Sequence, residues 1–241
     1  MPARLKYHFE PEHGWMNDPN GLVFFRGRYH AFFQHNPYGP VWGPMHWGHA
    51  VSDDLIHWEE LPVALAPEKE YENTGGCFSG SAVVRDDRLY LFYTSVANAN
   101  VQTQSMAYSD DGITFTKYEG NPIITQPPAD GSRDFRDPKV IKRGEEYLMV
   151  IGSGKDKVGK ILLYTSPDLL AWTYAGVLFE GAEYGPVLEC PDLFNIGDST
   201  VLMFSQTGQE QFATVMVLGE FDGRTFTPRS VHRPEAGPKF Y

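Results

Sequence analysis

Short apolar segments alternate with polar turns along the whole chain, and the same order of segments returns four times. In each unit a short apolar segment meets a turn and is followed by a stronger run of aliphatic and aromatic residues, as in successive β-strands. The first segments lie at 21–25, 81–84, 139–141 and 193–196, and the stronger runs at 29–34, 89–94, 147–152 and 201–206. No stretch shows the periodicity of an amphipathic helix, so the pattern predicts an all-β protein.

Each unit closes on one motif, an aspartate followed four residues later by an aromatic side chain. The motifs pair Asp54 with Trp58, Asp111 with Phe115, Asp168 with Trp172 and Asp222 with Phe226. The aspartates lie 57, 57 and 54 residues apart, so the chain contains an internal repeat. An aspartate that accepts backbone N–H groups in a turn, with an aromatic side chain packed between units, explains the motif fully. We therefore do not expect these four aspartates to be catalytic.

Four short antiparallel strands per unit, repeated at this spacing, predict the blades of a β-propeller. The chain would form a single propeller domain over 1–241, with units at 15–60, 77–118, 135–175 and 188–228. A β-sandwich is the main alternative, but it does not require a repeat of this length.

An acidic residue stands at the entrance to the first strand in three of the four units. Asp18, Asp137 and Glu189 precede the aspartate of their unit's motif by 36, 31 and 33 residues, and Ser79 takes this place in the second unit at 32 residues. First strands are innermost in a propeller, so equivalent positions in different blades converge on one axial pocket. The sequence therefore predicts three carboxyl groups in a single site.

Converging carboxyl groups suit glycoside hydrolysis, in which an ionised carboxylate and a protonated one flank the scissile bond. Neighbouring carboxylates push their pKa values apart, so one of them can keep a proton near neutral pH. We expect Glu189 to hold that proton because it follows an apolar stretch, and Asp18 to remain ionised as the nucleophile. Arg136 would keep the adjacent Asp137 charged and oriented.

Other chemistries find little support in the sequence. His46 and His49 have a loose metal-ligand spacing without a third partner, and the chain has neither a Gly-x-Ser-x-Gly elbow nor a glycine-rich phosphate loop. We expect no metal and no cofactor. A net charge of −11 argues against a nucleic-acid partner. No apolar run reaches the ~20 residues of a membrane helix, and the first residues lack a secretory signal, so we expect no membrane partner and a cytoplasmic location.

The motifs around the acids resemble those of glycoside hydrolase family 32, which contains invertases, levanases, inulinases and sucrose-6-phosphate hydrolases. Residues 8–21 read HFEPEHGWMNDPNG, and WGHAVS (47–52), FSGS (78–81), FRDP (135–138) and ECP (189–191) follow in the family's order. The resemblance covers essentially the whole chain. It implies a retaining β-fructofuranosidase with a five-bladed propeller and an active site in its axial funnel.

The resemblance also implies a role for each acid. Asp18 corresponds to the nucleophile, Glu189 to the general acid/base, and Asp137 to the acid that grips the 3- and 4-hydroxyls of the fructosyl ring. The residues expected to bind substrate are Trp15, Asn17, Gln34, Trp42, Phe78, Ser79 and Arg136. Gln34 as a strand-end polar group and Trp42 as a packed surface aromatic remain alternatives.

The chain departs from the family pattern at its C-terminus. Family members continue from a segment like 236–241 into a fifth blade and usually a β-sandwich, and by the spacing of the repeat a fifth unit would run to about residue 280. We expect 229–241 to begin a fifth unit that this chain lacks, and apolar residues near Phe24 and Phe25 and in 201–204 to contact water at the open faces. The chain would then self-associate or recruit a partner in the gap, unless four blades close alone.

Three functions stay open on the sequence. Hydrolysis of a small fructoside, sucrose, sucrose-6-phosphate or a short fructo-oligosaccharide, is the main hypothesis. A fructosyltransferase would use the same covalent intermediate, and a truncated, non-catalytic propeller would bind fructosides without cleaving them. An arabinan-cleaving propeller shares the three acids but lacks the WMNDPNG context of Asp18.

Overall fold

The strands of the protein form four antiparallel sheets of four strands each in the computed structural model, which describes residue 5 and residues 8–208 and 214–234. The first two sheets contain β1 (Trp15–Phe25), β2 (Arg28–Asn36), β3 (His46–Ser52) and β4 (Glu59–Leu65), then β5 (Gly76–Arg85), β6 (Arg88–Ala97), β7 (Val101–Ser109) and β8 (Thr116–Lys117). The last two contain β9 (Phe135–Arg143), β10 (Glu146–Lys155), β11 (Val158–Ser166) and β12 (Thr173–Gly181), then β13 (Leu188–Ile196), β14 (Ser199–Gln206), β15 (Thr214–Phe221) and β16 (Phe226–His232).

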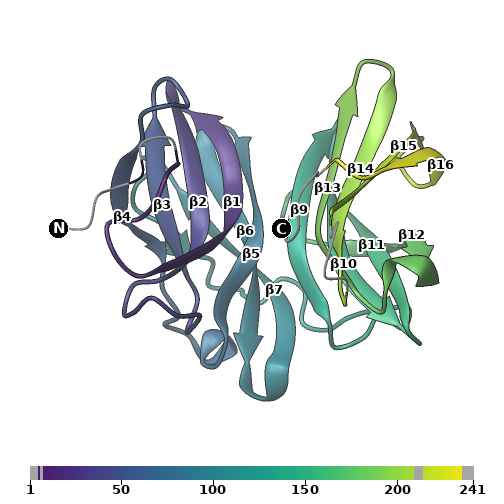
Figure 1. Cartoon of the computed structure of the whole chain (residues 1–241), viewed down its shortest axis with the longest axis horizontal. Coiled ribbons are helices and arrows are strands. Elements are labelled where there is room, and N and C mark those ends of the chain that lie inside the picture. The colour runs from purple at the N-terminus through teal and green to yellow at the C-terminus, as the bar shows by residue number, and fades with distance from the viewer. Residues whose placement is uncertain (1–4, 6–7, 209–213, 235–241) are drawn as a thin grey trace.

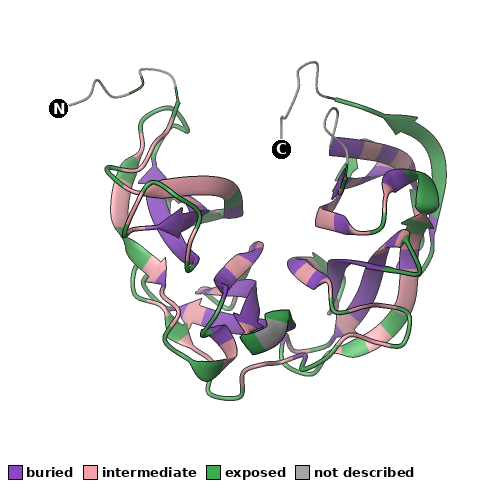
Figure 2. Ribbon diagram, turned by 60° about the horizontal axis from the view of Figure 1, so that its bottom comes forward, coloured by how far each residue is buried: buried purple, intermediate pink, exposed green. Residues whose placement is uncertain are grey.

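The four sheets stand side by side as the blades of a propeller (Figure 1). Within each blade the strands pair in chain order, and the first strands contact one another in the series β1, β5, β9, β13. Figure 2 shows the blades following an arc around a common centre, with a gap between the first blade and the fourth. The predicted fold class, an all-β propeller with four blades in this chain, is confirmed.

The helices of the described chain are three 3-10 turns between strands, η1 (Glu70–Glu72), η2 (Asn98–Asn100) and η3 (Ala182–Tyr184). None of these turns has the length or the apolar character needed to cross a membrane.

Three hydrophobic cores lie between successive blades. The first joins β2 and β3 to β6, with Trp47 and Tyr93 among its largest buried side chains. The second joins the second and third blades around Phe92 and Phe135, and the third joins the third and fourth blades around Leu188 and Phe204. Each blade is therefore stabilised by burial against its neighbours more than by a core of its own.

The aspartate motifs are turns, as predicted. In each motif Oδ1 of the aspartate accepts two backbone N–H bonds of 2.7–2.9 Å from the residues two and three positions later. The aromatic residue packs on the preceding blade in three cases, Phe115 on Phe32 at 5.5 Å between ring centroids, Trp172 on Phe92 at 6.0 Å and Phe226 on Phe179 at 6.5 Å.

Every first strand carries a β-bulge at the same place. In each bulge, two residues of the first strand oppose a single residue of the second strand. Residues 17–18 oppose Gln34, 78–79 oppose Thr94, 137–138 oppose Ile151, and 190–191 oppose Phe204. Such a bulge bends the strand and re-aims a side chain. Asp18 and Asp137 lie within the bulges of their blades, and Glu189 directly precedes the bulge of the fourth blade.

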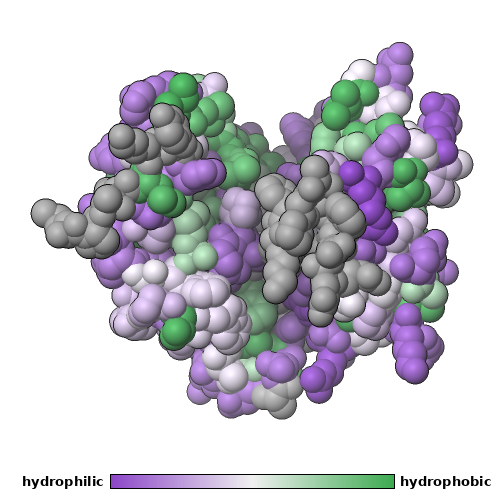
Figure 3. All heavy atoms as spheres, in the orientation of Figure 1, coloured by the Kyte–Doolittle hydropathy of each residue, from purple (hydrophilic) through white to green (hydrophobic). Residues whose placement is uncertain are grey.

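Two expectations about the ends of the repeat are wrong. Residues 201, 202 and 204 are buried, because Leu202 and Phe204 belong to the core between the third and fourth blades. Phe25 is buried as well, whereas Phe24 is exposed as expected. Hydrophobic residues form small separate patches on the face shown in Figure 3.

Residues 229–232 complete β16 of the fourth blade instead of starting a fifth, and residues 235–241 lie outside the described part of the chain.

Candidate active site

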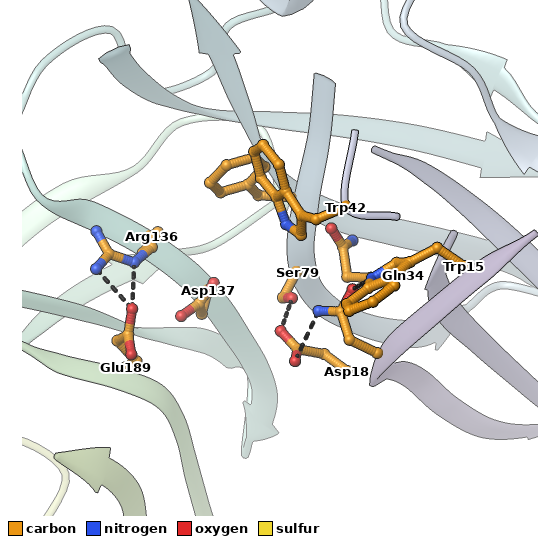
Figure 4. Close-up of a pocket in the computed structure, with 10 residues that line it drawn as sticks. Trp15, Asp18, Gln34, Trp42, Ser79, Arg136, Asp137 and Glu189 are labelled. Carbon is orange, nitrogen blue, oxygen red and sulfur yellow. Dashed lines mark hydrogen bonds and ion pairs between the residues drawn. The ribbon is translucent and has the colours of Figure 1, made fainter. Parts of the chain in front are cut away.

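All ten residues predicted to form the site line one cavity of about 370 Å³ (Figure 4). The first strands supply Trp15, Asn17, Asp18, Phe78, Ser79, Arg136, Asp137 and Glu189, while Gln34 comes from β2 and Trp42 from the loop between β2 and β3. The bulges help to explain this convergence, since every lining residue of the first strands except Trp15 lies in a bulge or directly before one.

Asp18 sits on one side of the cavity with two hydrogen-bond donors. Oγ of Ser79 donates to its Oδ2 at 2.5 Å, and Nδ2 of Asn17 donates to its Oδ1 at 3.0 Å (Figure 4). Asn17 is itself fixed by Nε1 of Trp15, which donates to Oδ1 of Asn17 at 2.7 Å. These bonds orient the carboxylate from two blades at once, which suits a nucleophile that must meet one carbon atom.

Glu189 lies across the cavity and is bound by Arg136. Nε and Nη2 of Arg136 donate to Oε1 of Glu189 at 3.0 and 2.6 Å, and Nη1 donates to Oδ1 of Asp134 at 2.9 Å. We expected Arg136 to orient the adjacent Asp137. The guanidinium instead turns to the next blade, so it holds the carboxyl group of Glu189 by two charge-assisted bonds.

Asp137 lies between the other two acids in Figure 4 and is the most enclosed of the three. Its Oδ2 accepts a 2.9 Å hydrogen bond from the backbone N–H of Cys190. The pKa of Asp137 is raised to about 7, mainly by burial and also by the negative charges of Glu189 and Asp18, although Arg136 and the Cys190 N–H act in the opposite direction. From the sequence we expected the proton on Glu189; in the structure Asp137 is the most buried of the three acids, and its pKa is raised.

Gln34 and Trp42 contribute in different ways. The Gln34 side chain is buried, lines the cavity and donates from Nε2 to the carbonyl oxygen of Cys77 at 3.0 Å, so it also joins the first two blades. Trp42 is 55% exposed and meets the ring of Phe78 edge-on at 6.0 Å, so these two rings form an aromatic wall of the cavity. Trp42 therefore lies on the wall of the cavity with part of its ring exposed, which suits contact with a sugar ring.

Cys190 is a further residue of the site, and we did not expect it from the sequence. Its Sγ lies 3.5 Å from Oδ2 of Asp137 and 3.9 Å from Oδ2 of Asp18, so the thiol stands between two carboxylates. A signal was present in the sequence, because Cys190 precedes Pro191 as Asp137 precedes Pro138.

His46 and His49 do not form a metal site. Nδ1 of His46 contacts the carbonyl oxygen of Pro44 at 2.8 Å, and Nε2 of His49 contacts Nδ1 of His30 at 3.0 Å. Within the described ranges no group of three or more His, Cys, Asp or Glu residues is arranged to hold a metal ion.

The site can now be compared with known proteins. Residues 8–241 match the family model described as the glycosyl hydrolases family 32 N-terminal domain. A levanase of Bacillus subtilis is 48% identical over 208 aligned residues, which are 80% of this chain and 29% of the levanase. A sucrose-6-phosphate hydrolase of Zymomonas mobilis is 41% identical over 262 aligned positions, covering 98% of this chain and 51% of that protein.

Solved structures agree with the sequence comparison. The structure of a β-fructofuranosidase of Bombyx mori matches with a TM-score of 0.87 at 42% identity, over 95% of this chain and 52% of that one. The chain spans about half the length of this enzyme and of the Zymomonas protein, and less of the levanase. Because the family model covers nearly the whole chain and the relatives align across the cavity's four blades, the chain belongs to glycoside hydrolase family 32.

Proposed function

We propose that this site hydrolyses the terminal β-D-fructofuranosyl residue of sucrose or sucrose-6-phosphate by a retaining double displacement. One observation carries the proposal, namely that Asp18 and Glu189 stand on opposite sides of one cavity with Asp137 between them (Figure 4). A retaining pair requires carboxyl groups about 5–5.5 Å apart across the scissile bond.

In the first step Oδ1 or Oδ2 of Asp18 attacks the anomeric carbon of the fructosyl ring. Glu189 gives a proton to the glycosidic oxygen, and the glucose moiety leaves. The donors Ser79 and Asn17 keep the attacking carboxylate in place, so little reorganisation is needed when charge develops on the ring.

In the second step the fructosyl-enzyme ester is hydrolysed. Glu189 now takes a proton from a water molecule, the water oxygen bonds to the anomeric carbon, and the carboxylate of Asp18 is released. Asp137 would bind the ring hydroxyls. Hydrogen bonds to an enclosed carboxylate strengthen as the ring gains positive charge, so Asp137 lowers the barrier more than it tightens substrate binding.

The relatives support a fructoside as substrate. A variant of the Bombyx mori enzyme has been solved in complex with sucrose, and a variant of a fructan 1-exohydrolase of Cichorium intybus in complex with 1-kestose. The aromatic wall of Trp42 and Phe78 lines the same cavity as the three carboxyl groups, which suits a ring with one apolar face and several hydroxyls.

The test is release of fructose by the purified chain from sucrose, sucrose-6-phosphate, inulin and levan. Proton NMR of the first-formed sugar distinguishes retention from inversion. Asp18→Asn should abolish release, while Asp168→Asn, which alters a turn far from the cavity, should keep it. Binding of sucrose by the wild-type chain without release of fructose would contradict the proposal and indicate a binding propeller.

A further inference from the structure

The backbone of Asp137 adopts a conformation that side-chain-bearing residues seldom use. Its φ angle is 64°, in the left-handed region that favours glycine. Such a conformation persists only when the surrounding structure holds it. Neither Asp18 nor Glu189 has a positive φ angle, so Asp137 alone among the three acids needs this support.

The second blade supplies the support through two side chains. The backbone N–H of Asp137 donates to Oγ1 of Thr94 at 2.9 Å, and Oγ1 of Thr94 donates to Oε1 of Gln104 at 2.8 Å. Nε2 of Gln104 then donates to the carbonyl oxygen of Phe135 at 2.8 Å. Both side chains are fully buried, so water cannot replace these bonds.

The direction of every bond in this chain is determined. The Phe135 carbonyl only accepts, so the amide nitrogen of Gln104 faces it and the amide oxygen faces Thr94. The single hydroxyl proton of Thr94 is therefore used on Gln104. A lone pair of the hydroxyl remains for the N–H of Asp137.

Thr94 holds the same place in its blade as Gln34 holds in the first. Each opposes the bulge of its own first strand, and each binds the backbone of the next blade's first strand, Gln34 at Cys77 and Thr94 at Asp137. The contact thus belongs to a blade-to-blade arrangement. Among the described residues, only the contact from the second blade ends on the backbone N–H of a residue whose carboxyl group lines the site.

We propose that Thr94 and Gln104 are positioning residues for Asp137, holding its carboxyl group at the angle that the transition state requires. Neither side chain lines the cavity. The kinetic part of this inference rests on the proposed fructoside hydrolysis, but the contact itself can be measured separately.

The first experiment compares three variants on sucrose. Thr94→Val keeps the shape but removes the acceptor, and should lower kcat by about 10- to 100-fold with KM within about twofold. Thr94→Ser restores the hydroxyl and should recover most of the loss. The matched control is Ser95→Ala, because Ser95 is equally buried on the same strand but bonds Oγ of Ser105 at 2.5 Å within its own blade. It should leave kcat within about twofold.

The second experiment follows the backbone amide of Asp137 by NMR hydrogen exchange. Thr94→Val should speed this exchange at least about tenfold relative to the Val140 amide, which is held by Ser81. If the wild-type chain releases no fructose, the proposed function fails while the exchange data still decide the positioning role. Wild-type kcat in Thr94→Val, an equal loss in Ser95→Ala, or unchanged exchange at Asp137 would each overturn the inference.

Discussion

Neutralising Asp137 should make the protein more stable although it removes a site carboxylate. Asp137→Asn preserves the shape of the side chain and can still accept the Cys190 N–H. The side chain is 6% exposed, and burial together with two neighbouring acids raises its pKa from 3.8 to about 7. An ionised carboxylate is thus costly at this place, and asparagine avoids that cost.

The size of the effect follows from proton linkage. Between pH 4 and pH 7 the native state keeps a proton on Asp137 that the unfolded state has lost, so the free energy of unfolding of the wild type falls as pH rises. Each pKa unit is worth 1.36 kcal/mol, so the advantage of Asp137→Asn grows from about 1 kcal/mol at pH 4.5 to about 4 kcal/mol at pH 8. For a chain of this size the melting temperatures should separate by roughly 6–12 °C more at pH 8 than at pH 4.5.

Thermal unfolding of both proteins across this pH range tests the reasoning. Asp87→Asn is the control, because it neutralises a surface carboxyl group whose side chain is 74% exposed and whose ion pair with Arg26 is screened by solvent. The control should stay within about 1 kcal/mol of the wild type at every pH. A constant difference between Asp137→Asn and the wild type from pH 4.5 to pH 8, or a less stable variant at pH 8, would refute the argument.

Three further outcomes are expected. Asp18→Asn should form no covalent fructosyl-enzyme, as judged by intact mass after rapid quenching, and a trapped adduct in this variant would exclude Asp18 as nucleophile. Glu189→Gln should slow sucrose far more than a fructoside with an activated leaving group, and equal losses on the two substrates would argue against its acid role. Leu55 and Leu169 hold the same left-handed place in their turns, with φ of 65° and 72°, but are 56% and 1% exposed. Leu55→Gly should therefore raise the free energy of unfolding by up to about 1 kcal/mol, while Leu169→Gly should lower it by about 2–4 kcal/mol; denaturant unfolding that shows the same sign for both would contradict this.

Convergence of the acids was predictable because the repeat alone places Asp18, Asp137 and Glu189 near the start of the first strand of their units. The bulges that aim them were not, because an extra residue in a strand leaves little trace in the short alternation of apolar and polar side chains. The hydrogen-bond partner of Arg136 could not be predicted from the sequence either. Both Asp137 and Glu189 lie near it, and only the path of β9 decides which carboxyl group the guanidinium meets.

Burial was predicted less well than position. Glu189 follows apolar residues in sequence, yet Asp137 is the more enclosed acid, because enclosure depends on the strands of adjacent blades and not on flanking residues. The predicted exposure of residues 201–204 was wrong for the same reason. Their strand faces the third blade, and sequence alone does not tell which side of a blade meets its neighbour.

Each of the four first strands has one bulge where it passes the axial site. One backbone device presents a nucleophile at Asp18, a hydroxyl at Ser79, an acid at Asp137 and a thiol at Cys190, with Glu189 one residue earlier. The bulges are of two kinds, because Asp137 and Cys190 come first in theirs and have positive φ angles, whereas Asp18 and Ser79 come second in theirs and do not. Replacing one side chain in a bulge therefore changes the functional group at the site, as far as the backbone of that bulge allows, while the interfaces between blades stay as they are.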